Sequence, residues 1–139
     1  MASGTVTIEI DDALLTIFLR LGLAHAQAQA QLPFSIKQVT AMIDGAGIEL
    51  VAGMARVTLQ PTLDAAGRID LRITAAKLAG MSLPGFLYGL LNNIINERVN
   101  ALLSGLVMQG LRPRLLDVRT RHRALVVTAE LAEVVTVDV

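Results

Sequence analysis

The chain of 139 residues contains no cysteine and no tryptophan, and its aromatic residues are one tyrosine and three phenylalanines. Without cysteine the protein forms no disulfide, has no thiol nucleophile and offers no cysteine-ligated metal site. Charged residues are scarce as well, at 17% of the chain, against about 25% in an ordinary domain. Because the 12 basic and 12 acidic residues cancel, no overall electric field attracts the protein to nucleic acid.

Aliphatic side chains are abundant instead, and hydrophobic residues make up 53% of the chain, against about 45–50% in ordinary domains. The length predicts a single domain spanning residues 1–139. The longest uncharged run, 78–96, contains Pro84 and ends at Glu97 and Arg98, so we expect no transmembrane helix. No signal peptide is visible, and we expect a cytoplasmic protein unless a leader has been removed.

Hydrophobic periodicity predicts the order of the secondary-structure elements. Strands are predicted at 5–10, 39–43, 48–51, 57–63, 69–73, 115–120 and 125–131, and helices from Asp12 to about Gln29 and from about Gly85 to Met108. Asp11 and Asp12 are well placed to cap the first helix. The order β-α-ββββ-α-ββ, with short turns between successive strands, predicts an α+β fold with an antiparallel sheet.

The second predicted helix carries apolar residues in neighbouring pairs every four positions, from Phe86-Leu87 to Leu106-Val107, with one break at Arg98. A four-residue step turns a helix through about 400°, so the apolar stripe drifts by about 40° each time. Such a winding stripe favours a long apolar helix wrapped by a curved sheet over a helix lying on a flat one. Asn92, Asn96 and Asn100 form a matching polar stripe, which is either a solvated ridge or the polar lining of a ligand cavity.

The sequence offers no convincing candidate for catalysis or metal binding. His25 and His122 have no neighbouring ligand at a spacing such as His-Glu-x-x-His. Ser82 lies in Gly-Met-Ser-Leu-Pro, which differs from the Gly-x-Ser-x-Gly nucleophile elbow. Asp11 and Asp12 are explained by helix capping. We therefore expect a protein that is not an enzyme and that holds no metal and no cofactor.

Five of the 12 basic residues fall within positions 112–123, namely Arg112, Arg114, Arg119, Arg121 and Arg123. Asp117 is the one acidic residue among them. Such a cluster is either a solvated sheet edge protected against aggregation or an anion patch for the headgroups of an anionic membrane. Nucleic acid is the less favoured partner, because no aromatic residue for base stacking lies between these arginines.

Several segments in the second half of the chain carry a resemblance to a known family. They read Gly-Arg-Ile-Asp-Leu-Arg-Ile-Thr-Ala-Ala-Lys from Gly67, then Gly-Met-Ser-Leu-Pro, then the second helix, then Leu-Arg-Pro-Arg-Leu-Leu-Asp-Val and Ala-Leu-Val-Val-Thr-Ala, ending near Leu131. In pattern and order the chain resembles the tubular lipid-binding (TULIP) superfamily, in its short, single-domain bacterial form. This resemblance implies a sheet rolled around a helix, with an apolar groove that takes acyl chains.

The favoured hypothesis is therefore non-enzymatic binding of a lipid or fatty-acid-like ligand in an apolar groove between the helices and the curved sheet. The expected lining residues are Leu15, Phe18, Leu19, Phe86, Leu90, Leu91, Ile94 and Ile95. The alternative is a structural module whose surplus apolar surface forms a homodimer. Both hypotheses bury the same residues, so the sequence does not separate them.

Overall fold

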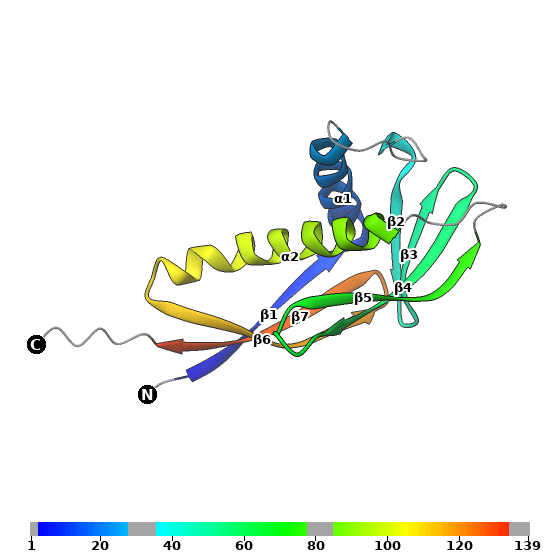
Figure 1. The fold of residues 1–139 in the computed structure, drawn as a ribbon. Helices are drawn as coiled ribbons and strands as arrows, with labels where there is room; N and C mark the ends of the chain where they lie inside the picture. The colour runs from blue at the N-terminus through cyan, green and yellow to red at the C-terminus, as the bar shows by residue number, and fades with distance from the viewer. Residues whose placement is uncertain (1–2, 28–35, 78–84, 134–139) are drawn as a thin grey trace, which may run out of the picture.

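The computed structural model describes residues 3–27, 36–77 and 85–133 of the chain (Figure 1). Its strands are β1 (Ser3–Asp11), β2 (Thr40–Asp44), β3 (Gly47–Ala52), β4 (Ala55–Leu63), β5 (Ile69–Lys77), β6 (Leu111–Arg121) and β7 (Ala124–Glu133). Its helices are α1 (Asp12–Gln27), the short 3-10 helix η1 (Ile36–Gln38) and α2 (Gly85–Val107). The α+β class, the antiparallel pairing and the order β-α-ββββ-α-ββ are confirmed.

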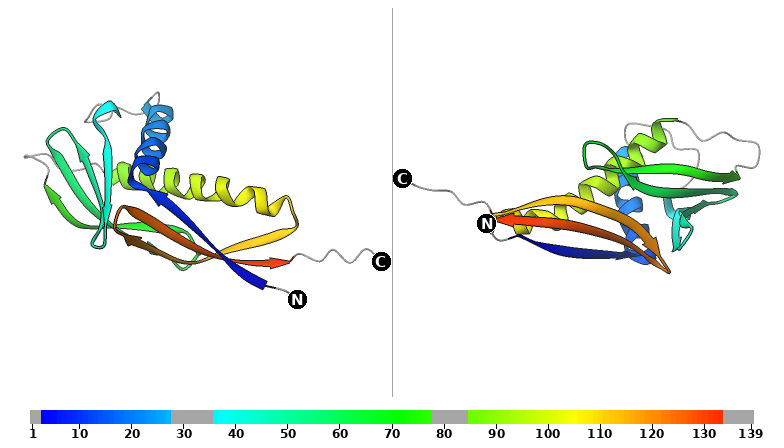
Figure 2. Two further views of the ribbon diagram at one scale, coloured as in Figure 1. Left: turned by 180° about the vertical axis from the view of Figure 1, so that it is seen from behind. Right: turned by 90° about the horizontal axis from the view of Figure 1, so that it is seen from below.

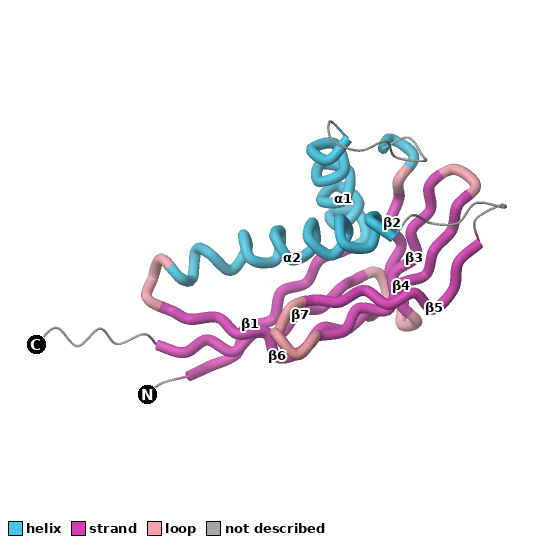
Figure 3. Tube along the Cα trace, in the orientation of Figure 1, coloured by secondary structure: helices cyan, strands magenta, loops and turns pink. Residues whose placement is uncertain are grey.

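Within the described residues the strands form two sheets, where the sequence suggested one curved sheet around a helix. Sheet A has the order β1-β7-β6, and sheet B has the order β2-β3-β4-β5 (Figure 3). In sheet A, β7 lies in the centre and pairs with β1 from Ser3 to Asp11 on one side and with β6 on the other, and neither β1 nor β6 pairs with an edge of sheet B in the described residues. Helix α2 is not fully enclosed either, since Leu102 and Val107 on it are about half exposed.

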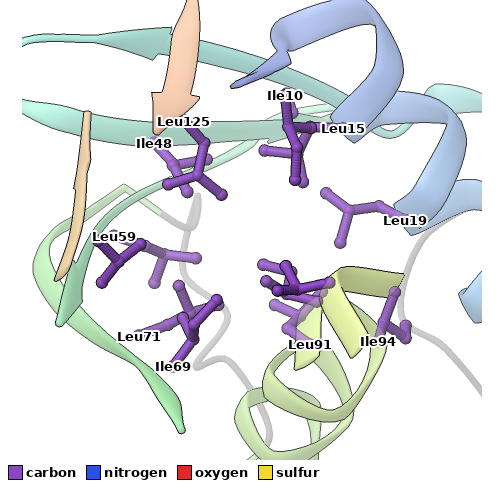
Figure 4. Close-up of a cluster of buried hydrophobic side chains, with 14 of the residues drawn as sticks. Ile10, Leu15, Leu19, Ile48, Leu59, Ile69, Leu71, Leu91, Ile94 and Leu125 are labelled. Carbon is purple, nitrogen blue, oxygen red and sulfur yellow. The ribbon is translucent and has the colours of Figure 1, made fainter. Parts of the chain in front are cut away.

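A single hydrophobic core lies where the two helices and the two sheets meet (Figure 4). It contains Ile10 of β1, Leu15 of α1, Ile48 of β3, Leu59 of β4 and Leu125 of β7, all of them almost completely buried. These side chains come from elements throughout the sequence, so one core is shared by sheets A and B.

The hairpin between β6 and β7 connects sheet A to sheet B at the start of α1. The Arg123 N–H donates to the Ile43 carbonyl at the end of β2 (2.8 Å), and the Asp12 N–H donates to the Arg123 carbonyl (3.3 Å). The Leu14 N–H donates to Oδ1 of Asp11 (2.7 Å), so the predicted helix cap is confirmed for Asp11. These bonds hold one end of sheet B firmly against sheet A.

The helices α1 and α2 cross in close contact, with α1 standing across the N-terminal half of α2 (Figure 2). The contact depends on Gly22, because a Cβ atom placed there would lie 2.5 Å from Cγ1 of Ile94. A glycine at this position therefore permits an approach that any larger residue would prevent.

Candidate functional site

The asparagine stripe of α2 binds the backbone of β5, which is an edge strand of sheet B. Oδ1 of Asn96 accepts the Ile69 N–H (2.8 Å), and its Nδ2 donates to the Ile69 carbonyl (3.0 Å). One helical turn earlier, Oδ1 of Asn92 accepts the Leu71 N–H (2.9 Å). For Asn92 and Asn96 both sequence interpretations were wrong, since these side chains neither form a solvated ridge nor line a cavity. Asn100 is exposed, as a ridge residue would be.

Helix α1 binds the opposite edge strand, β2, in the same manner. Oγ1 of Thr16 accepts the Ala41 N–H (2.9 Å), and Nε of Arg20 donates to the Val39 carbonyl (2.8 Å). Thr16 and Asn96 are the buried polar side chains of the described residues, and each one caps an edge strand of sheet B. Buried polar groups are costly unless they are hydrogen-bonded, so their burial is explained by this capping.

The geometry of helices and strands explains why this capping repeats. Residues four apart on a helix are separated by about 6.0 Å along its axis, and residues two apart on a strand by about 6.6–6.8 Å. Thr16 and Arg20 therefore match Ala41 and Val39, as Asn92 and Asn96 match Leu71 and Ile69. Since α1 also packs on α2, the elements β2, β3, β4, β5, α2 and α1 close into a ring. We call this arrangement the helix-closed ring.

One end of the helix-closed ring contains an apolar recess of about 40 Å³. The residues that line it are Leu23 of α1, Val39, Leu50 and Ala52 of β3, Ala55 and Val57 of β4, and Leu87 and Leu91 of α2. All of these side chains are hydrocarbon. We call this the recess end of the ring. The opposite end is closed by the bonds among Asp12, Ile43 and Arg123.

The structure divides the predicted ligand-lining residues into several groups. Leu91 lines the recess, and Leu15, Leu19 and Ile95 are buried in the core. Leu90 and Ile94 line an open groove of about 340 Å³ between α1 and α2, outside the ring. Among the predicted ligand-lining residues whose side chains the structure describes, Leu91 is thus the one that lines the recess.

Of the two predicted phenylalanines, Phe18 lies away from the recess. The Phe18 ring is half-buried, with the Arg98 guanidinium 5.9 Å from its centre. Phe86 lies at the start of α2, but its side chain lies outside the described residues. Four of the seven lining residues that were not predicted come from the hairpin between β3 and β4, whose small and apolar residues have the pattern of an ordinary strand.

The five clustered arginines all lie on the exposed side of sheet A or at its hairpin. A β-bulge at Leu116 shifts the alternation of β6, so that Arg112 and Arg114 share the outer face with Arg119 and Arg121. The bulge therefore gathers the cluster on one surface.

Four of these arginines contact carboxylates. Arg114 lies 3.3 Å from Glu130, Nε of Arg119 lies 2.6 Å from Asp117, Nε of Arg123 lies 3.5 Å from Asp12, and Arg121 pairs with Glu9. Exposed pairs of this kind contribute about 0–1 kcal/mol each, but they neutralise the local field. This pairing favours the solvated sheet face over an anion patch.

Chemical groups for catalysis are not gathered in the part of the chain that the structure describes. There, His, Cys, Asp and Glu side chains form no group of three that would hold a metal ion. His25 borders the groove between the helices, and His122 is exposed at the hairpin between β6 and β7. Burial raises the pKa of the Tyr88 phenol above its usual 10.0, so this group stays uncharged near neutral pH. No described helix is both long enough and apolar enough to cross a membrane.

Comparison with known proteins adds no assignment: no family model, curated protein or solved structure matches this chain. Its function is therefore argued from the geometry of the recess and its surroundings.

Proposed function

We propose that the protein binds the acyl chain of a lipid, or a similar hydrophobic ligand, at the recess end of the helix-closed ring. The wholly apolar lining of the recess is the observation that supports this proposal most directly. A closed ring with an apolar interior is also consistent with the proposed likeness to the tubular lipid-binding superfamily. Ligand pockets of this kind need few polar groups, because the hydrophobic effect supplies most of the binding free energy.

The size of the recess defines how a ligand would bind. Pockets for small molecules measure about 300–1,000 Å³, whereas the recess holds about 40 Å³. We therefore propose that an acyl chain enters by displacing side chains of the ring, with its terminal methyl group in the recess. Entry of this kind is a shift between two packings of the same core.

Strand β5 supplies an apolar path from the recess to the surface. Its register places Ala76 opposite Val57, which lines the recess, and Ile73 opposite Leu59. Ile73 is 41% exposed and Ala76 is exposed as well. The described hydrogen bonds from α2 to β5 reach no further than Leu71, so this part of the β5 edge is not held by α2. We propose that the chain of the ligand leaves the ring here.

A homodimer is the second candidate, and a specific surface supports it. Ile17 and Leu21 of α1 are each about half exposed, and Met42 of β2 is 44% exposed. Ile17 and Met42 border the same shallow hollow, and Leu21 follows Ile17 by one helical turn. Apolar residues gathered in this way are common at isologous interfaces.

Native mass spectrometry of protein purified from cells tests both proposals. Under gentle conditions we expect a monomer that carries one lipid or fatty acid, released on denaturation and recovered in an organic extract. The homodimer proposal is supported instead if the protein is a ligand-free dimer and if Ile17→Asp dissociates it. A ligand-free monomer that also fails to take up added fatty acid would rule out the lipid-binding proposal.

A further inference from the structure

We infer that the recess end of the helix-closed ring docks on an anionic lipid bilayer, through the tip of the hairpin between β3 and β4 and the basic residues beside it. The inference rests on the proposed function for its biological purpose, although docking is measurable without a bound ligand. It places membrane contact at this end of the ring and away from the arginines of sheet A.

The tip of the hairpin carries an exposed apolar side chain. Met54 is 82% exposed, next to Gly53, whose φ of 62° forms the tight turn. The Gln38 side chain lies against this turn, since its Oε1 is 3.4 Å from the position of a Cβ on Gly53. Helix η1 and its exposed Lys37 therefore stand beside Met54. A flexible apolar side chain next to a cation is suited to the boundary between headgroups and acyl chains.

Two further cations face one another on the other side of the hairpin. Arg56 of β4 and Lys77 of β5 are directly opposite in the register, and both are exposed. Like charges in this position repel each other. Both residues line a hollow of about 320 Å³, together with Glu49, which pairs with Arg56 and leaves the Lys77 ammonium as the cation that faces a headgroup.

The charge balance distinguishes this end from sheet A. Glu49 is the carboxylate near Arg56, at 3.6 Å. Lys37, Arg56 and Lys77 against Glu49 give three positive charges and one negative charge, a net charge of +2. The connecting segments 28–35 and 78–84 contain no charged residue, so they leave this sum unchanged. On sheet A, the five clustered arginines and the four carboxylates that they contact give a net charge of +1. Lys37 and Lys77 at the recess end have no such carboxylate in the described ion pairs.

Co-sedimentation with vesicles tests the inference, using phosphatidylcholine vesicles with and without phosphatidylglycerol. Each basic residue at an anionic surface contributes about fivefold to binding, so K37Q/K77Q should weaken binding to the anionic vesicles by about 25-fold. The matched control R114Q/R119Q removes the same charge from sheet A and should change binding by less than about twofold. In 1 M salt, where the Debye length is about 3 Å, the preference for anionic vesicles should disappear.

A second variant tests the hairpin tip. Met54→Ser should weaken binding to the anionic vesicles about tenfold by removing apolar burial, and should leave the dependence on salt unchanged. The docking inference is overturned if the arginine control loses as much binding as K37Q/K77Q, if neither variant changes binding, or if the parent protein binds both vesicle types equally. Equal capture of a single-stranded oligonucleotide, lost in K37Q/K77Q, would assign the basic end to nucleic acid and also overturn the inference.

Ligand binding in solution separates this inference from the proposed function. K37Q/K77Q should bind a fluorescent fatty acid as the parent does when no vesicles are present. If the parent fails to bind the fatty acid but docks on anionic vesicles as expected, the proposed function fails and the docking surface stands. If the parent binds the fatty acid but does not dock on anionic vesicles, the docking inference fails and the proposed function stands.

Discussion

The polar residues with the strongest structural role are those that bind the edges of sheet B. Asn96 is 5% exposed and makes two hydrogen bonds to Ile69 and one to the Asn92 carbonyl. Its amide thus replaces the strand that would otherwise pair with this part of β5. An exposed strand edge invites aggregation, so covering it protects the fold as well as closing the ring.

Changing Asn96 to Ala should lower the free energy of unfolding by roughly 2–4 kcal/mol, because the Ile69 N–H and carbonyl lose their partners while buried. Asn100 provides a matched control on the same stripe of α2. It is exposed, so Asn100→Ala should change the free energy of unfolding by less than about 0.5 kcal/mol. Urea denaturation of the two variants measures the difference, and equal losses would show that the stripe acts only as a solvated surface.

The sequence predicts that the asparagines share a helix face, but it does not predict what they bind. The spacing of Asn92, Asn96 and Asn100 is a local property, whereas the partners of the first two lie 21 and 27 residues away. The same holds for Arg121, whose partner Glu9 is 112 residues away. Composition gives no sign of such tertiary hydrogen bonds and ion pairs, which decide whether a polar stripe is solvated or buried.

At the scale of elements, the contact between α1 and α2 closes the ring, and Gly22 sets its closeness. Elsewhere a glycine in a helix costs about 0.5–1 kcal/mol relative to alanine. At Gly22 the added Cβ would fall within 2.8 Å of three Ile94 side-chain atoms. The steric clash would cost more than the better helix propensity of alanine would gain. The glycine is therefore retained for packing.

The two glycines Gly22 and Gly105 should respond to alanine in opposite directions. Gly22→Ala should lower the melting temperature, whereas Gly105→Ala, with no atom within 4 Å of the new Cβ, should raise stability by about 0.5–1 kcal/mol. Ile94→Ala removes the clashing atoms, so the double variant with Gly22→Ala should be more stable than the sum of the single changes predicts. Strict additivity, or a stabilised Gly22→Ala protein, would contradict the close crossing.

The strands were predictable because alternation of apolar and polar residues is local, as in Ile69, Leu71 and the polar residues between them. The division into two sheets was not, because it depends on which strand edges pair with each other, which alternation does not specify. The bulge at Leu116 was also missed. One extra residue in β6 changes the face of the sheet on which the following arginines lie, and the amino-acid composition does not reveal it.

At the scale of the whole molecule, the helix-closed ring has two unlike ends. One is tied to sheet A by the bonds among Asp12, Ile43 and Arg123. The other holds the apolar recess beneath an exposed methionine and three cations. Under the proposed function, the first end would anchor the ring to sheet A, and the second would contact the lipid and its ligand.

Titration with a fluorescent fatty acid tests this account most directly, in the parent protein and in two phenylalanine variants. Ala52→Phe places a large side chain in the recess, from a half-buried position in a strand, where aromatic residues are common. Ala101→Phe is the control, because it adds the same side chain at an exposed position on α2. We predict a one-to-one complex in the parent and in Ala101→Phe, and at least tenfold weaker binding in Ala52→Phe, whose cooperative melting transition should show that it still folds although the added ring lowers the melting temperature. Equal binding by all three proteins, or binding by none, would contradict the assignment of the recess as the ligand site.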